Sequence, residues 1–143
     1  MEESLTYLKE QFELPDVDVR SYSPLVLAYI GDGIYELVIR TAVVGQGNRQ
    51  ANALHKKTST YVKASAQAAM MEAILEDLTE EELAVYKRGR NAKTVSMAKH
   101  ATMHDYRHAT GLEALMGYLY LNHQTNRLID LVKLGMERTE GMP

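Results

Sequence analysis

Two carboxylates occur in stretches of the sequence that are otherwise apolar. Asp32 lies within LAYIGDGIY, and Glu113 lies within LEALMGYLYL. A carboxylate in apolar surroundings costs free energy unless it is paired, hydrogen-bonded or bound to a metal ion. Asp32 and Glu113 are therefore candidate metal ligands. The spacing alone leaves open the alternative that each is a surface acid in an ion pair.

The composition restricts the chemistry that such a pair could support. The 143 residues include no cysteine, so disulfides, thiolate metal sites and a cysteine nucleophile are excluded. Any bound metal ion must be held by oxygen or histidine ligands. We expect one globular domain over residues 1–143, in the cytoplasm, because neither a secretory signal nor a membrane span is evident.

Positive charge is concentrated in one part of an acidic chain. Six basic residues and one acid fall between Lys87 and His108, a net charge of +5, which leaves −8 on the rest of a chain whose total is −3. This asymmetry indicates an anion-binding surface, although a solvated loop would explain it equally well. The candidate residues of this anion-binding surface are Lys87, Arg88, Arg90, Asn91, Lys93 and Lys99.

Capping and breaking residues predict the helices that would position these groups. Ser23 precedes Pro24, the proline suits the first turn of a helix, and the glycines at 45 and 47 would end that helix. A second, long core helix is expected over 49–77, capped by Asn48. A third should open at a capping box formed by Thr79 and Glu82 and stop at Gly89.

The remainder of the chain completes an all-α pattern. We expect a loop over 90–104, a helix from Asp105 to Asn122, and a last helix from about Asn126. Alternation with period two, the signature of strands, is not sustained anywhere. The fold class is therefore an all-α helical bundle.

Three histidines, His100, His104 and His108, recur at intervals of four. On one continuous helix they could form a metal-binding face. A helix that starts at Asp105 would break this register, so we assign the histidines to the same surface as the basic residues instead.

Both acidic stretches resemble motifs of the ribonuclease III family. YSPLVLAYIGDGIYELVIR is similar to its signature helix, and LEALMGYLYL is similar to its second motif. The stand-alone Mini-ribonuclease III family matches best, because RGRNAK at 88–93 and YRHATGLEALMGYLYL at 106–121 also fit its pattern. The resemblance implies a dimeric ribonuclease III-like fold, without the separate double-stranded RNA-binding domain of larger relatives.

The resemblance also implies roles for individual residues. Asp32 matches the catalytic aspartate and Glu113 the metal-binding glutamate, and Mg²⁺ is the expected cofactor. Two further acids of larger relatives are replaced here by Ala28 and Thr110. Glu36, one turn after Asp32, could compensate as a ligand or could instead pair with Arg40, four residues later.

The implied activity is Mg²⁺-dependent hydrolysis of double-stranded RNA by a homodimer that cuts both strands. The anion-binding surface from Lys87 to Lys99 is then expected to bind the RNA, with the three histidines on the RNA-facing side. The resemblance further points to maturation of the ends of the large-subunit (23S) ribosomal RNA precursor. Two alternatives from other classes remain. One is a catalytically silent RNA-binding or ribosome-assembly module, and the other is a purely structural helical dimer.

Overall fold

A computed structural model describes residues 2–92 and 102–139. Within these ranges the chain forms seven α-helices and no strand, which confirms the all-α class. Two short 3-10 turns, η1 (Val19–Ser21) and η2 (Leu75–Asp77), connect helices. The helices are α1 (Glu2–Gln11), α2 (Pro24–Gly45), α3 (Ala51–Val62), α4 (Ala64–Ile74), α5 (Glu80–Asn91), α6 (Met103–Leu121) and α7 (Thr125–Thr139).

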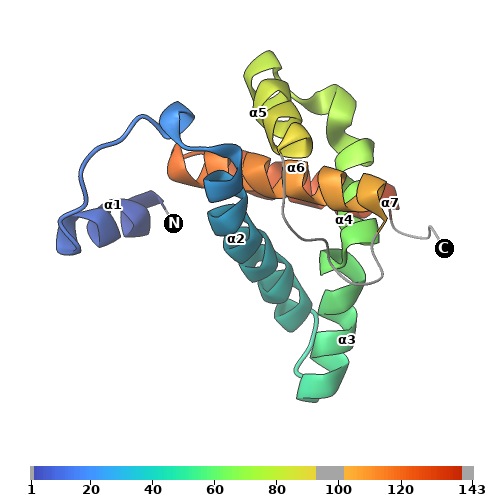
Figure 1. Cartoon of the computed structure of the whole chain (residues 1–143). Helices are drawn as coiled ribbons and strands as arrows, with labels where there is room; N and C mark the ends of the chain where they lie inside the picture. Colours follow the sequence, from blue (N-terminus) through green and yellow to red (C-terminus); the bar gives the residue numbers. More distant parts are fainter. Residues whose placement is uncertain (1, 93–101, 140–143) are drawn as a thin grey trace.

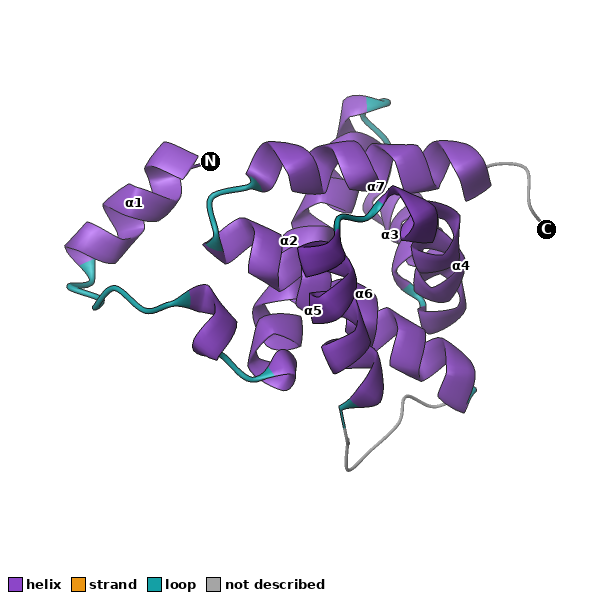
Figure 2. Ribbon diagram, turned by 90° about the horizontal axis from the view of Figure 1, so that it is seen from above, coloured by secondary structure: helices purple, strands orange, loops and turns teal. Residues whose placement is uncertain are grey.

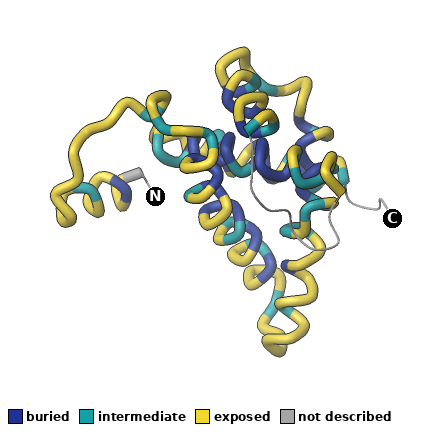
Figure 3. Tube along the Cα trace, in the orientation of Figure 1, coloured by how far each residue is buried: buried dark blue, intermediate teal, exposed yellow. Residues whose placement is uncertain are grey.

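Helix α6 is the centre of the bundle. It packs most extensively against α2, then against α5 and α4, and these helices surround it in Figure 1. Almost every side chain from Ala109 to Leu119 is buried, and Figure 3 shows this part of the chain as the most buried. An all-round apolar helix is the type that occupies the interior of a helical domain. Glu113 is therefore an acid on the most buried helix of the described chain.

Helix α1 stands apart from this bundle in both views of the molecule (Figures 1 and 2). An extended segment joins it to η1, and its Leu5 is buried. Its other large apolar side chains, Tyr7 and Leu8, are exposed. This helix is not predicted by the pattern of the sequence. No helix in the described part of the chain has the length and apolarity that crossing a membrane would need.

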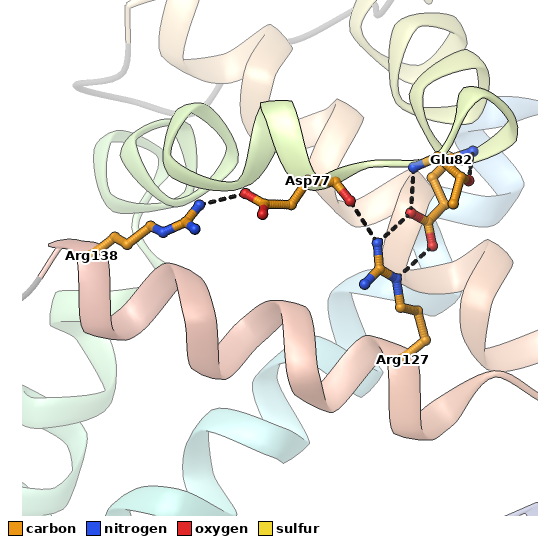
Figure 4. A network of polar contacts seen from close by, with 5 residues as sticks. Asp77, Glu82, Arg127 and Arg138 are labelled. Carbon is orange, nitrogen blue, oxygen red and sulfur yellow. Dashed lines mark hydrogen bonds and ion pairs between the residues drawn. The ribbon is translucent and has the colours of Figure 1, made fainter.

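Two predicted helix starts are confirmed at the level of side-chain hydrogen bonds. The hydroxyl oxygen of Ser23 accepts from Val26 N at the start of α2. Thr79 and Glu82 form the reciprocal capping box that opens α5. Figure 4 shows that Glu82 also receives two 2.9 Å hydrogen bonds from Arg127 on α7. The start of α5 is thereby fixed to α7.

The prediction of one long core helix over 49–77 is wrong in two respects. The chain breaks at Lys63, where ψ is 153°, so α3 and α4 are separate helices. Only α4 belongs to the core, because Thr58 is the one buried residue of α3. The predicted cap at Asn48 is also wrong, since Gln50 occupies the N-cap position and makes no side-chain capping bond.

The predicted end of the next helix at Gly89 is wrong as well. Helix α5 continues to Asn91, and Gly89 is buried within it. A Cβ at this position would lie 2.7 Å from the Cβ of Ala114 and 3.0 Å from the Cα of Gly111. Glycine is therefore present here because α5 and α6 approach closely, and it does not end the helix.

The loop predicted over 90–104 is wrong at its two ends, which are helical. Arg90 and Asn91 belong to α5, and α6 starts at Met103 instead of Asp105, with Thr102 as its cap. Thr102 accepts from Asp105 N at 3.0 Å. Lys93 and Lys99, predicted to bind RNA, lie outside the described residues, as does His100.

Candidate active site

The crossing of α2 and α6 brings the two predicted acids together. A Cβ on Gly31 would lie 1.6 Å from the carbonyl oxygen of Glu113, and one on Gly117 would lie 1.9 Å from that of Leu27. The two helices therefore meet backbone to backbone, at a separation that only glycine permits. Because Asp32 directly follows Gly31, this contact places its carboxylate beside that of Glu113.

Asp32 and Glu113 differ in their exposure to solvent. Asp32 is exposed, whereas Glu113 is half-buried. Burial, a hydrogen bond with Asp32 and the charge of Asp32 together raise the pKa of Glu113 to about 8. Two carboxylates can share a hydrogen bond only when one of them carries a proton. Without a bound cation, the pair therefore retains a proton at neutral pH.

The acid pair borders an open pocket of about 510 Å³. The pocket is built from one face of α2 and the first half of α6. Ala28 and Thr110 also line it, so the two positions at which larger relatives carry acids do face this site. The hydroxyl of Thr110 donates to the carbonyl of Tyr106 at 2.9 Å. The lining residues are Leu25, Ala28, Tyr29, Ile30, Asp32, Gly33, Tyr106, Thr110 and Glu113.

The donor set of this pocket fits a hydrated divalent cation. Among the described residues, no three histidine, aspartate or glutamate side chains gather as a metal-binding group, so Asp32 and Glu113 would be the only carboxylate ligands. Magnesium commonly binds through one or two carboxylates and keeps several waters. A positive charge beside the two acids would also offset the burial and the charge of Asp32, which together favour the protonated form of Glu113. The half-open pocket leaves room for those waters.

Glu36 does not contribute to the pocket. Its Oε1 atom lies 3.5 Å from a guanidinium nitrogen of Arg40, one turn further along α2, and it is absent from the pocket lining. Of the two alternatives left by the sequence, the structure supports the ion pair.

The described part of the basic segment lies on the last turns of α5. Lys87, Arg88 and Asn91 are exposed, and Arg90 is half-buried. The guanidinium of Arg88 donates to the carbonyl of Tyr22 at 3.3 Å. That of Arg90 lies 5.5 Å from the centre of the Tyr86 ring and also donates to Asn91. These contacts orient both arginines along the helix surface.

The basic end of α5 also lies near the acid pair. A Cβ on Gly89 would come within 3.2 Å of the carbonyl oxygen of Thr110, one turn before Glu113. The segment that carries Lys87 to Asn91 is therefore packed against the part of α6 that forms the pocket.

His104 and His108 do share one helix, because α6 begins at Met103. Their ring centres are 4.2 Å apart, and His108 Nδ1 lies 2.6 Å from the Tyr86 hydroxyl. Burial and the neighbouring His104 and Arg90 lower the pKa of His108. The hydrogen bond between His108 Nδ1 and the Tyr86 hydroxyl joins α6 to α5.

Gln67 on α4 is a polar residue at the site that sequence reasoning missed. Its side chain is buried, and it lies close enough to Glu113 to act on the pKa of that acid. The signal was present, because a glutamine within ASAQAAMMEAI is as unusual in a core helix as the two acids. Its contact with Glu113 could not be predicted, since it depends on the break at Lys63.

Comparison with known proteins assigns this fold and site to one class. The model of the Ribonuclease III domain family matches residues 25–124. A crystal structure of a protein from Fusobacterium nucleatum superposes with a TM-score of 0.76 at 33% identity, covering 85% of this chain and 98% of that one.

More specific relatives are the proteins named Mini-ribonuclease 3. That of Thermoanaerobacter sp. is 46% identical over 141 residues, covering 98% of this chain and 99% of the relative. That of Enterococcus faecalis is 50% identical over 117 residues, covering 80% and 89% respectively. The chain belongs to the Mini-ribonuclease 3 family, and it is an endoribonuclease of the ribonuclease III type.

Proposed function

We propose that this endoribonuclease hydrolyses double-stranded RNA with Mg²⁺ held by Asp32 and Glu113. The observation that carries the proposal is the pair of adjacent carboxylates at the edge of an open pocket, one of them with its pKa raised to about 8. In the absence of a cation, burial and the charge of Asp32 disfavour ionisation of Glu113. The pair is therefore suited to binding a cation together with the phosphate of a substrate.

The residues of the pocket favour attack by water over attack by a side chain. The Thr110 hydroxyl donates to a backbone carbonyl, and the chain contains no cysteine. A divalent cation here would polarise water and neutralise charge on the phosphate. The carboxylates of Asp32 and Glu113 would orient that cation, while Tyr29 and Tyr106 form part of the surrounding wall.

Recognition of the duplex is assigned to the basic segment. A-form RNA presents phosphates and 2′-hydroxyls, which a basic surface recognises by shape and charge. Lys87, Arg88, Arg90 and Asn91 lie on the end of α5 that packs through Gly89 against the helix that carries Glu113. The proposal includes Lys93 and Lys99, which continue the segment along the chain.

The proposal includes a two-fold dimer, because two equivalent sites would cut the two strands of a duplex. Several large apolar side chains of α2 are exposed in the single chain, including Val26, Tyr29, Leu37 and Val44. An exposed apolar helix face supports self-association. Light scattering at micromolar concentration should give the mass of a dimer, and a monomer that makes paired cuts would contradict this part.

The proposed substrate is the precursor of large-subunit (23S) ribosomal RNA, processed in the cytoplasm. This part comes from the family resemblance, and the residues of the site do not select one duplex over another. Incubating the purified protein with precursor transcripts, and mapping the ends that it generates, would test it. Cuts distributed without preference along the duplex would contradict a specific role in end maturation.

The decisive experiment compares cleavage of a labelled RNA duplex by the wild type, Asp32→Asn and Glu113→Gln. Both substitutions preserve size while removing charge, so helicity should remain normal and Mg²⁺-dependent cleavage should be lost. Chelation of Mg²⁺ should abolish wild-type cleavage as well. Duplex binding without any cleavage by the wild type would instead indicate a silent RNA-binding module.

A further inference from the structure

The junction between α3 and α4 is stabilised by side chains in place of backbone donors. The extended conformation of Lys63 interrupts the helical hydrogen-bond pattern, so the last carbonyls of α3 need other partners. The hydroxyl of Tyr35 donates to the carbonyl of Tyr61 at 2.8 Å. The side-chain amide of Gln67 donates to the carbonyl of Val62 at 2.9 Å. The junction therefore fixes the orientation of the Gln67 amide group.

The buried side chain of Gln67 is energetically unfavourable at its position. Its side chain is 3% exposed, and its Oε1 is the one buried side-chain polar atom of the described residues that has no hydrogen-bond partner. A buried acceptor without a partner destabilises the folded state. An apolar side chain of similar length would avoid this cost while still packing against the core. The bond to Val62 uses one donor of the amide and leaves its second N–H and its oxygen unaccounted for.

The second contact of the amide indicates a role for it. One N–H of Gln67 is directed to Val62, and the side chain also lies beside the carboxylate of Glu113, on whose pKa it acts. Glu113 thus contacts Gln67 from α4 and Asp32 from α2. A carboxylate held from two helices has less rotational freedom than one that projects freely into a pocket.

We propose that Gln67 is a positioning residue, which orients the Glu113 carboxylate toward Asp32 and so prepares both acids to bind a divalent cation. This inference rests on the proposed function, because it takes Glu113 as a metal ligand. Groups that hydrogen-bond to ligating carboxylates commonly contribute a factor of about 10 to 100 to metal affinity. Gln67 would act through Glu113 without touching the RNA.

The test measures metal affinity directly, by calorimetric titration of the full chain with Mn²⁺, which prefers the same oxygen ligands as Mg²⁺. Gln67→Met keeps the length of the side chain and removes both amide donors. It should weaken Mn²⁺ binding about tenfold. Tyr35→Phe is the matched control, since it removes the other hydrogen bond at the same junction and should leave Mn²⁺ affinity within about twofold. Thermal melts would verify that both variants fold.

A second measurement does not depend on whether the methionine variant folds. The side-chain amide resonances of Gln67 in the wild-type protein should shift on saturation with Mg²⁺. The same titration of Glu113→Gln should leave them unmoved. If the wild-type protein binds Mg²⁺ and the Gln67 amide resonances do not shift, the inference is overturned.

The outcomes separate this inference from the proposed function. Undiminished Mn²⁺ affinity in Glu113→Gln would overturn the assignment of Glu113 as a ligand, and with it both proposals. Loss of affinity in Glu113→Gln, with wild-type affinity in a folded Gln67→Met, would overturn only the role of Gln67. An equal loss in Tyr35→Phe and Gln67→Met would also overturn it, because the junction as a whole would then determine affinity.

Discussion

Gly31 packs directly on the backbone of Glu113, so that a Cβ at position 31 would lie 1.6 Å from the Glu113 carbonyl oxygen. The residue that precedes one acid of the site is thus in contact with the other acid. The distance between α2 and α6 and the distance between the two carboxylates are set by the same contact.

Substitution of Gly31 by alanine should therefore be strongly destabilising. The obstructing atoms belong to the backbone of α6 and cannot rotate away, so the helices must separate. We expect a loss of about 3 kcal/mol or more in the free energy of unfolding, measured by urea denaturation. Gly33→Ala is the matched control on the same helix, because nothing lies within 4 Å of its Cβ position. It should stabilise α2 by up to about 1 kcal/mol, and equal losses in both variants would contradict this account.

The pocket offers a way to test whether two carboxylates limit metal affinity. Thr110 lines the pocket where larger relatives carry an acid. Thr110→Asp should lower the Mg²⁺ concentration required for half-maximal cleavage, roughly three- to tenfold, because a third carboxylate adds charge and a ligand oxygen. Thr110→Asn, of the same size but neutral, should not. An aspartate variant with the metal requirement of the wild type would show that position 110 does not reach the ion.

Particular residues show what the sequence could and could not predict. The caps at Ser23 and Thr79 were correct because capping depends on residues within one turn. The stop at Gly89 was wrong because close packing against α6 accounts for that glycine, and this contact is invisible in a local pattern. The break at Lys63 could not be predicted, because neither glycine nor proline marks it in the sequence.

The same distinction applies to the candidate site. Asp32 and Glu113 were identified because acids in apolar helices are conspicuous, and the structure places them together. Gln67 was missed because its role depends on three helices meeting around Glu113. The possible ligand role of Glu36 could be decided only from the observed contact with Arg40.

The basic segment should contribute to duplex affinity through its charge. Replacing Arg88, Arg90 and Lys93 together with alanine should weaken binding. The slope of the logarithm of the binding constant against the logarithm of salt concentration should fall in magnitude by about 0.9 for each phosphate that is no longer neutralised. Filter binding at several salt concentrations would measure this. Lys56 and Lys57 on the exposed helix α3 provide a basic comparison surface. If the slope is unchanged in the triple variant and reduced after Lys56→Ala and Lys57→Ala, RNA binding must be assigned to α3 instead.

Single substitutions would separate binding from catalysis within this segment. Arg90 lies over the Tyr86 ring, whose hydroxyl contacts His108 on α6, whereas Arg88 reaches Tyr22. If Arg90 only binds the duplex, saturating RNA should restore the cleavage rate of Arg90→Ala. A rate that stays low at saturation would place Arg90 at the scissile phosphate.

The raised pKa of Glu113 predicts a distinctive dependence of stability on pH in the metal-free protein. Burial, followed by the hydrogen bond with Asp32, raises this pKa from the ordinary 4.5 to about 8. Between these values the folded protein binds more protons than the unfolded chain, so the contribution of Glu113 is fully present below pH 4.5 and is lost as the pH rises toward 8.

Glu113→Gln resembles the protonated acid and lacks this dependence. Urea midpoints in the presence of a chelator should therefore show the wild type losing stability relative to Glu113→Gln from pH 5 to pH 8, by at most about 1.4 kcal/mol for each pH unit. Mg²⁺ should reduce the difference, because it favours the ionised form that the fold alone disfavours. If the urea midpoints of the two metal-free proteins change with pH in parallel, the pKa of Glu113 is not raised in the folded protein, and the prediction is contradicted.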